Sequence, residues 1–384
     1  MPKLDFNAII HALRTDYLKA MPAGAQVLVS AGCSGRWYFD WVTEQYGPVA
    51  KHYGVEAYSP QPQDLPENAI WLKEEIDSMR SIPDGSADLV FAGQTIEHLW
   101  PSQFAGFLLE ARRVLRPGGT LVMDSPNRLV THMTGWYQPQ HTAELRVDEI
   151  VKVTQMAGFK VDAVKGMWLC YDREKHLAYP FEPENYDTFD FATDPRVIAA
   201  ADRPQDSFIW WLEASADDTP SQPKAAIEAV LQSIYDQAFD AALNRWWHSV
   251  GTASGQGRNR LVKVATGEIG YPVFGPYIPL RPGTHSAHFH IGLTQPPKRP
   301  ERQALLIDVS AEMGTRTIAQ RWLSSWDLKL RKLTRFDLTF ESSETLFGVE
   351  FRVLTHGKVA VAVRAPVDYL DHGQWRAMGL TPNP

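Results

Sequence analysis

Two histidines and one glutamate are the candidates for proton transfer. Glu97 and His98 follow a short apolar run, and His141 opens a helical segment further along the chain. A neutral imidazole can remove a proton near neutral pH, and a neighbouring carboxylate can orient it. We therefore consider His98 as a general base with Glu97 beside it, and His141 as the rival base. The alternative for His98 is a structural role at the start of a helix.

A turn of small residues and a later acid have the types needed to bind a nucleoside. The strand expected at 26–30 ends in Ser30 and runs into Ala31, Gly32 and, after two more residues, Gly35. Small residues let the backbone approach a ligand, and the helix that follows offers free amides at its amino end. Glu56 ends the next expected strand, where a carboxylate can accept both hydroxyls of a ribose. For the turn alone, an ordinary strand-to-helix connection is the alternative.

A strand–helix–strand unit over residues 87–127 places the proton-transfer candidates. Residues 89–92 are a short apolar run, typical of a buried parallel strand. Apolar residues at helical spacing over 104–115 predict a crossover helix, and a second apolar run follows at 120–123. Ligands bind at the carboxyl ends of parallel strands. We therefore expect chemistry at Gln94 and at the residues directly after it.

Three motifs in this unit resemble class I S-adenosylmethionine-dependent methyltransferases. They are Asp88-Leu-Val-Phe, Glu97-His-Leu and Arg116-Pro-Gly-Gly before a strand, in the order of that family's fourth strand, next helix and fifth strand. The resemblance implies a Rossmann-like α/β sheet and S-adenosyl-L-methionine as cofactor. It also implies that the turn from Ser30 to Gly35 cradles the methionine part of the cofactor.

The same resemblance implies how the nucleoside is held. Glu56 would bind the ribose, and Glu75 with Ile76, after the third strand, would read the adenine; Asp77 is the competing choice for the acid. Gln94 would contact the cofactor from the end of the fourth strand. The chain departs from the family where three alternating glycines and a strand-ending acid are usual. It has two glycines there and no such acid, so the partner of the cofactor's amino group stays open.

The segments 94–101 and 141–145 are similar to methyltransferases encoded beside bacterial glycosyltransferases. This resemblance implies O-methylation of a saccharide hydroxyl, in a surface polysaccharide such as O-antigen or in its precursor. Thirteen tryptophans could supply stacking surfaces for sugars. Two alternatives stay open: an inactive methyltransferase-like scaffold for glycan assembly, and a nicotinamide-dependent oxidoreductase. The oxidoreductase would share Glu56, but the turn lacks the three-glycine spacing of dinucleotide enzymes.

The length and the change of hydrophobic period predict two domains. We expect a methyltransferase domain over 1–216 with an insertion at 171–206, a helical linker over 217–265, and an all-β sandwich over 266–384. The last part alternates apolar and polar residues in six short strands, a jelly-roll-like pattern. It is weakly similar to β-sandwich modules of bacterial glycan-assembly proteins. That similarity implies that it binds carbohydrate, or a glycosyltransferase or export partner.

Composition excludes several other classes. A net charge of −7 argues against nucleic acid as the main partner. Cys33 and Cys170 are the only cysteines and indicate neither a disulfide framework nor a zinc site. The histidines show no ligand spacing upstream, so we expect no metal. The amino terminus lacks a signal-peptide pattern and no run is long enough to span a membrane, so we expect a cytoplasmic protein.

Overall fold

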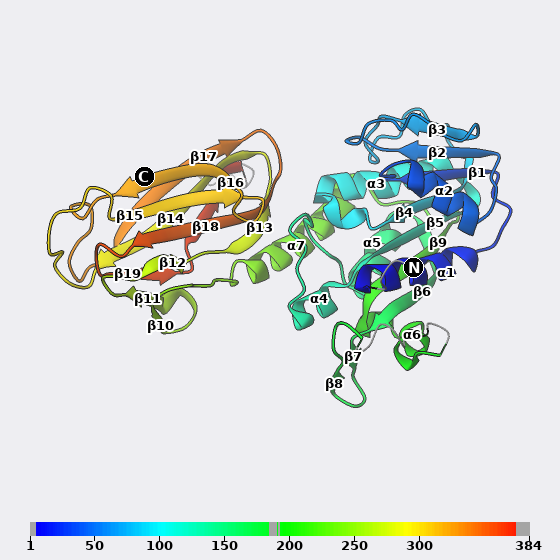
Figure 1. Cartoon of the computed structure of the whole chain (residues 1–384). Helices are drawn as coiled ribbons and strands as arrows, with labels where there is room; N and C mark the ends of the chain where they lie inside the picture. The colour runs from blue at the N-terminus through cyan, green and yellow to red at the C-terminus, as the bar shows by residue number, and fades with distance from the viewer. Residues whose placement is uncertain (1–4, 184–189, 191–192, 374–384) are drawn as a thin grey trace. The chain divides into compact units, whose positions relative to one another are not determined.

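The computed structural model describes residues 5–183, 190 and 193–373. They form two compact units (Figure 1). The first unit consists of residues 1–137 and 142–236, and the second of residues 138–141 and 237–384, within the described ranges. No helix in the described part of the chain is long and apolar enough to cross a membrane.

The first unit is built on a seven-stranded sheet. Its strands, in spatial order, are β3 (Ala69–Leu72), β2 (Lys51–Val55), β1 (Val27–Ala31), β4 (Ala87–Gly93), β5 (Leu115–Pro126), β9 (Ser207–Ala216) and β6 (Phe159–Leu169). The first five are parallel, in the order of a doubly wound dinucleotide-binding sheet. β9 is antiparallel to both β5 and β6. The predicted strand–helix–strand unit is present as β4, α3 (Pro101–Val114) and β5.

Both faces of this sheet are covered. The helices α1 (Phe6–Lys19) and α2 (Arg36–Gln45) share one hydrophobic cluster with Phe91 and Trp211 of the sheet. Val90 and Trp210, whose side chains point to the other face, are also fully buried. α5 (Val147–Met156) packs against β6, and α3 packs against β5. The near-continuous apolar sequence of β4 follows from burial on both sides.

The segment predicted as an insertion, 171–206, connects β6 to β9. It contains the hairpin of β7 (Tyr171–Asp172) and β8 (Leu177–Ala178), then α6 (Pro195–Ala200) and the short 3-10 helix η3 (Pro204–Asp206). Residues 184–189 and 191–192 of this insertion lie outside the described residues. After β5 the chain forms α4 (Arg128–Thr134), and the 3-10 helix η1 (Ile96–His98) follows β4.

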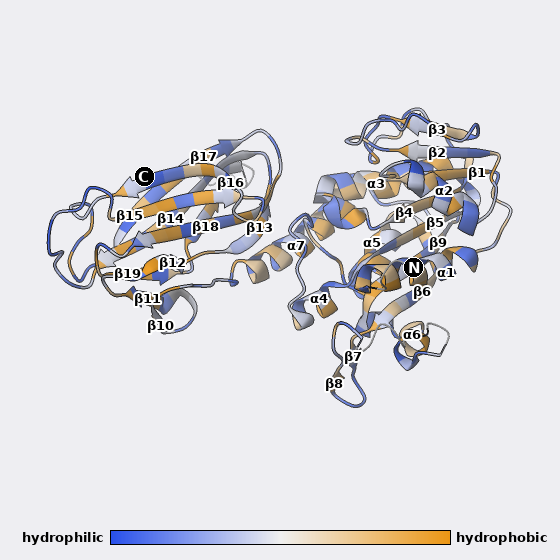
Figure 2. Ribbon diagram, in the orientation of Figure 1, coloured by the Kyte–Doolittle hydropathy of each residue, from blue (hydrophilic) through white to orange (hydrophobic). Residues whose placement is uncertain are grey.

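The second unit is β-rich. One sheet has the order β10 (Thr252–Ser254), β11 (Arg260–Val264), β19 (Val361–Ala365), β14 (Gly283–Leu293) and β17 (Thr334–Ser342), with β20 (Asp368–Asp371) also paired to β14. The other has the order β12 (Ile269–Val273), β18 (Leu346–His356), β15 (Leu305–Ala311) and β16 (Arg316–Leu323), with β13 (Pro276–Leu280) paired to β18. Orange and blue segments alternate along these strands (Figure 2). The buried residues of both sheets form one hydrophobic cluster.

The β-rich unit begins before residue 266, the boundary that the sequence predicts. β10 and β11 precede that residue and join the first sheet of the unit, because β11 pairs with β19 over five residues. The helix of the predicted linker is α7 (Lys224–Ala242), whose residues up to Asp236 belong to the first unit. The η4 turn (Gly257–Asn259) separates β10 from β11.

Candidate active site

The turn between β1 and α2 is closed tightly against the end of β4. Gly32 has a φ of 80°, and a Cβ there would lie 2.5 Å from the Thr95 side chain. The amide of Gly32 donates to the carbonyl of Val55 at 2.9 Å, and Thr95 Oγ1 donates to Ala31 O at 3.3 Å. Only glycine fits at residue 32. The turn that the sequence proposes as the cofactor cradle therefore has a fixed backbone.

The other end of the turn is open. Gly35 is the amino-terminal cap of α2 with a φ of 147°, and a Cβ there would meet only the Trp37 side chain, at 3.7 Å. The helix has no side-chain hydrogen bond at its cap. Its first amides are therefore accessible to an electronegative ligand atom, as the prediction for Gly35 requires.

Ser30 faces the interior instead of the turn. Its side chain is fully buried, and Ser30 Oγ lies 2.7 Å from His52 Nε2. Burial lowers the pKa of His52 to about 3, so this imidazole is neutral in the folded protein. The hydroxyl of Ser30 thus contributes to the packing of β1 on β2. Only the backbone of Ser30 is therefore available for a contact with the cofactor.

Glu56 lies at the carboxyl end of β2, as expected, and is only 9% exposed. Its Oε1 accepts the backbone amides of Tyr58 at 2.6 Å and Ser59 at 2.8 Å. Among the described residues, Oε2 takes part in no hydrogen bond. Oε1 therefore holds the carboxylate in place, while Oε2 can still accept hydrogen bonds from hydroxyl groups.

Glu75 lies near both Glu56 and the rival Asp77. Burial, then the nearby Asp77 and Glu56 carboxylates, raise the pKa of Glu75, while a hydrogen bond with Tyr58 lowers it. Asp77 packs against α3, where a Cβ on Gly106 would lie 2.8 Å from Asp77 Cβ. Ile76 is buried at 8% exposure. Glu56, Glu75 and Asp77 thus form one acidic cluster after β2 and β3, and the choice of Glu75 as the adenine-reading acid stays a prediction.

Gln94, directly after β4, has a strained backbone conformation. Its φ is 53°, which is unusual for a residue with a side chain. Its backbone amide donates to Asp124 O at 3.0 Å, and its Nε2 donates to Asp124 Oδ1 at 2.6 Å. The carboxyl ends of β4 and β5 are therefore linked through this pair.

Arg14 of α1 is a further candidate residue, which no motif in the sequence indicates. Arg14 Nε donates to Asp124 Oδ1 at 2.9 Å, with the two side chains 8% and 0% exposed. Arg14 Nη2 is buried and has no hydrogen-bond partner among the described residues, and neither has the Tyr38 hydroxyl. Burial raises the pKa of the Tyr38 hydroxyl above its ordinary value, and the positive charge of Arg14 opposes this shift. The sequence contains one indication that Arg14 is buried, because it lies on the same apolar face of α1 as Ile10 and Leu18.

Two of the proton-transfer candidates lie directly beyond β4. Glu97 and His98 are consecutive residues of η1, and Glu97 is fully buried, whereas His141 belongs to the second unit. Thr142, directly after His141, donates from its amide and its hydroxyl to Glu97 O, both at 2.8 Å. Imidazole and carboxylate groups transfer protons, and both are also ligands for divalent metal ions. The predicted absence of a metal therefore stays a prediction.

Residues 29–123 match the family model described as "Methyltransferase domain". Residues 29–123 of the first unit form a methyltransferase domain. A probable S-adenosylmethionine-dependent methyltransferase of Mycolicibacterium smegmatis is 41% identical over 90 residues, which are 23% of this chain and 34% of that protein. One of Mycobacterium tuberculosis is also 41% identical over 90 residues, 32% of its length. The chain thus spans about a third of the length of the curated relatives it matches.

Solved structures similar to the methyltransferase domain share little sequence with it. An S-adenosylmethionine-dependent methyltransferase from Archaeoglobus fulgidus has a TM-score of 0.37 at 18% identity, covering 55% of this chain and 100% of that one. A putative one from Listeria monocytogenes has a TM-score of 0.37 at 12% identity, covering 54% and 98%. S-adenosylmethionine is the cofactor of the methyltransferase domain. The spare oxygen of Glu56 and the open amino end of α2 fit its ribose and its polar tail.

Proposed function

We propose that this protein is an S-adenosylmethionine-dependent O-methyltransferase acting on a saccharide hydroxyl of a bacterial surface polysaccharide or its precursor. The observation that carries the proposal is the position of His98 and the fully buried Glu97 directly after β4, on the sheet edge that also carries the predicted cofactor residues. A hydroxyl is a weak nucleophile until it loses its proton. Imidazole next to a buried carboxylate is suited to that step.

The cofactor, when bound, supplies an electrophilic methyl group on a sulfonium. The chain's residues then have separate tasks. Glu56 accepts the ribose hydroxyls through Oε2, and Glu75 with Ile76 holds the base. His98 removes the proton of the acceptor hydroxyl, and Glu97 orients the imidazole of His98. His141 is the alternative base. Alignment of the acceptor oxygen with the methyl group provides most of the rate increase, because the displacement is in line.

The amino-acid end of the cofactor needs partners that replace the missing acid of β1. Arg14 Nη2 and the Tyr38 hydroxyl are buried donors beside the ends of β4 and β5, with no hydrogen-bond partner among the described residues. Buried donors of this kind are costly unless a ligand satisfies them. In our proposal they bind the carboxylate, and Asp124, already paired with Arg14, supplies the negative charge for the amino group.

The second unit, in this proposal, is a β-sandwich that binds glycan or docks a glycosyltransferase or export partner. Exposed indoles support the carbohydrate role, because sugars stack on such rings. Trp326 is 64% exposed, Trp247 44% and Trp322 38%. We also propose that the protein is cytoplasmic.

Incubation with isotopically labelled cofactor and a panel of glycans tests this function. We expect one glycan class to gain methyl groups by mass spectrometry, with one S-adenosylhomocysteine formed per methyl group. A protein that binds the cofactor and methylates no saccharide would contradict the proposal. It would favour the scaffold alternative if no other acceptor is methylated. The match to the methyltransferase family argues against the nicotinamide alternative.

A further inference from the structure

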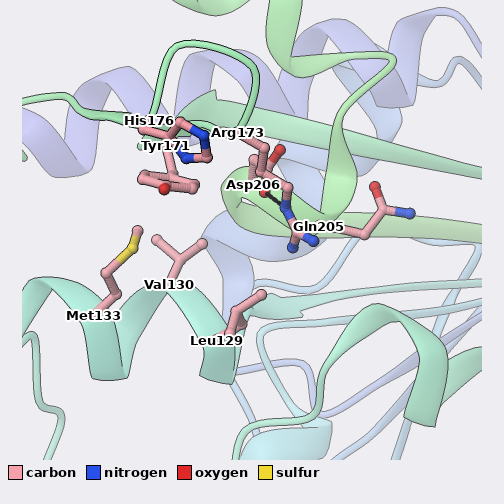
Figure 3. Close-up of a pocket in the computed structure, with 8 residues that line it drawn as sticks. All are labelled: Leu129, Val130, Met133, Tyr171, Arg173, His176, Gln205 and Asp206. Carbon is pink, nitrogen blue, oxygen red and sulfur yellow. Dashed lines mark hydrogen bonds and ion pairs between the residues drawn. The ribbon is translucent and has the colours of Figure 1, made fainter.

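A cavity of about 400 Å³ lies at the carboxyl edge of the first sheet, beyond β5 (Figure 3). Three segments line it: α4, the β7–β8 hairpin and η3. Asn127, which caps α4, fixes two of them together. Its Nδ2 donates to Pro204 O at 3.1 Å and to Gln205 O at 3.0 Å, and its amide donates to Phe208 O at 2.8 Å. The cavity is therefore attached rigidly to the end of β5.

The floor of this cavity is aliphatic. Leu129 and Met133 lie one helical turn apart on α4 and are 42% and 44% exposed, with Val130 buried beneath them. Figure 3 shows Val130 and Met133 pointing from the helix toward the ring of Tyr171, and Leu129 pointing toward Arg173. Large apolar side chains that face a cavity gain free energy when an apolar group displaces water. The hydroxyl groups of a sugar would find no hydrogen-bond partner on these aliphatic side chains.

The rim is polar and has spare donors. Arg173 Nε donates to Asp206, whose side chain is 10% exposed. The Asp206 carbonyl accepts the amide of Cys170 at 2.9 Å, which holds the base of the hairpin. Neither Nη of Arg173 has a hydrogen-bond partner among the described residues. His176, near Tyr171 in Figure 3, adds another polar group at the mouth.

A cavity with an apolar floor and a polar rim favours an amphipathic ligand, which has an apolar part and a polar part. We propose that this cavity binds an acyl or alkyl substituent of the methyl acceptor, with the sugar oxygens at Arg173. This inference rests on the proposed saccharide specificity and deepens it, because it makes the acceptor an amphipathic, chain-bearing saccharide. The cavity and the predicted cofactor residues share one edge of the sheet, over β5 to β6 and over β1 to β4 respectively. Acceptor and donor can thus approach from neighbouring positions.

A series of alkyl glucosides with chains of one to eight carbons tests this inference. Binding is measured by calorimetry on the full-length protein saturated with S-adenosylhomocysteine, below the micelle concentration of each glucoside. We expect affinity to rise about fourfold per methylene until the cavity is full, since a buried methylene contributes about 0.8 kcal/mol. Equal affinity along the series would overturn the inference.

Matched variants separate the cavity from non-specific binding. Met133→Gln should lower the affinity for octyl glucoside about tenfold and leave that for methyl glucoside unchanged. Met313→Gln, at a methionine that is 47% exposed in the second unit, should change neither. Arg173→Gln should weaken all members by a similar factor. An equal loss in both methionine variants would refute the proposed site.

The two proposals fail in different ways. If plain and acylated glycans are methylated with the same kcat/KM, the inference about the chain fails and the saccharide function stands. If octyl glucoside binds with the expected variant pattern but no saccharide is methylated, the function fails and the apolar site stands.

Discussion

Thr142 is hydrogen-bonded twice to the carbonyl oxygen of Glu97, through its amide and its hydroxyl, both at 2.8 Å. The same hydroxyl lies 2.6 Å from Leu99 O. These bonds hold the segment that begins at Thr142 against η1, which carries Glu97 and His98. His98 is therefore the first candidate for the proton transfer, and His141 stays the predicted alternative.

His98→Ala should lower kcat by about 10²–10⁴-fold and leave the dissociation constant of S-adenosylmethionine nearly unchanged, because a base acts only on the acceptor. Steady-state kinetics and calorimetry on the same preparation check this. His141→Ala is the matched control and should have the smaller effect on kcat. If His98→Ala lowers cofactor affinity as much as turnover, His98 is structural or binds cofactor, and His141 inherits the role of base.

Chelation should leave methyl transfer unchanged if His98 acts as a base. An imidazole that accepts a proton needs no metal ion. If Glu97, His98 and His141 instead held a catalytic divalent cation, the enzyme would lose activity when that cation is removed. Activity after treatment with EDTA, with elemental analysis of the purified protein, measures this. Loss of activity that a single divalent cation restores would instead make Glu97, His98 and His141 metal ligands.

The sequence predicted what local patterns encode. The strand–helix–strand unit of β4, α3 and β5 and the acid at Glu56 follow from short apolar runs and turn residues, and the structure has both. The pairing of Arg14 with Asp124 joins residues 110 positions apart, so no local period reveals it. The early start of the β-rich unit has the same cause, since β11 pairs with β19 roughly 100 residues later.

Acid should destabilise the protein partly through His52. The pKa of this buried histidine is about 3 in the folded state, below its ordinary value of 6.5. The unfolded chain therefore binds a proton that the folded chain does not, and stability falls as pH drops from 6.5 toward 3. Between pH 7 and pH 5 this one group should cost about 2 kcal/mol of unfolding free energy.

The double variant Ser30→Ala with His52→Leu removes both partners of the buried hydrogen bond. Urea unfolding at the two pH values should show a smaller pH dependence for this variant than for the wild type. An identical dependence would mean that His52 is protonated in the folded protein, against the structure.

The Arg14–Asp124 pair should serve both stability and cofactor binding. Arg14→Met leaves a buried carboxylate unpaired and should cost about 3–5 kcal/mol of unfolding free energy. Adding Asp124→Asn removes that charge and keeps an acceptor for Gln94, so most of the stability should return. Affinity for S-adenosylmethionine should stay low in the double variant, because Arg14 Nη2 is still missing. If stability and affinity recover together, Arg14 is structural only.

Calorimetric titration of S-adenosylmethionine into the wild type and Glu56→Gln tests the central claim most directly. Glutamine can keep the oxygen that binds the amides of Tyr58 and Ser59, and it replaces the spare acceptor oxygen by a donor. We expect one site in the wild type and an affinity about 10 to 100-fold lower in the variant, since charged hydrogen bonds contribute about 1.5–3 kcal/mol. Equal affinities, or no binding to the wild type, would contradict the account.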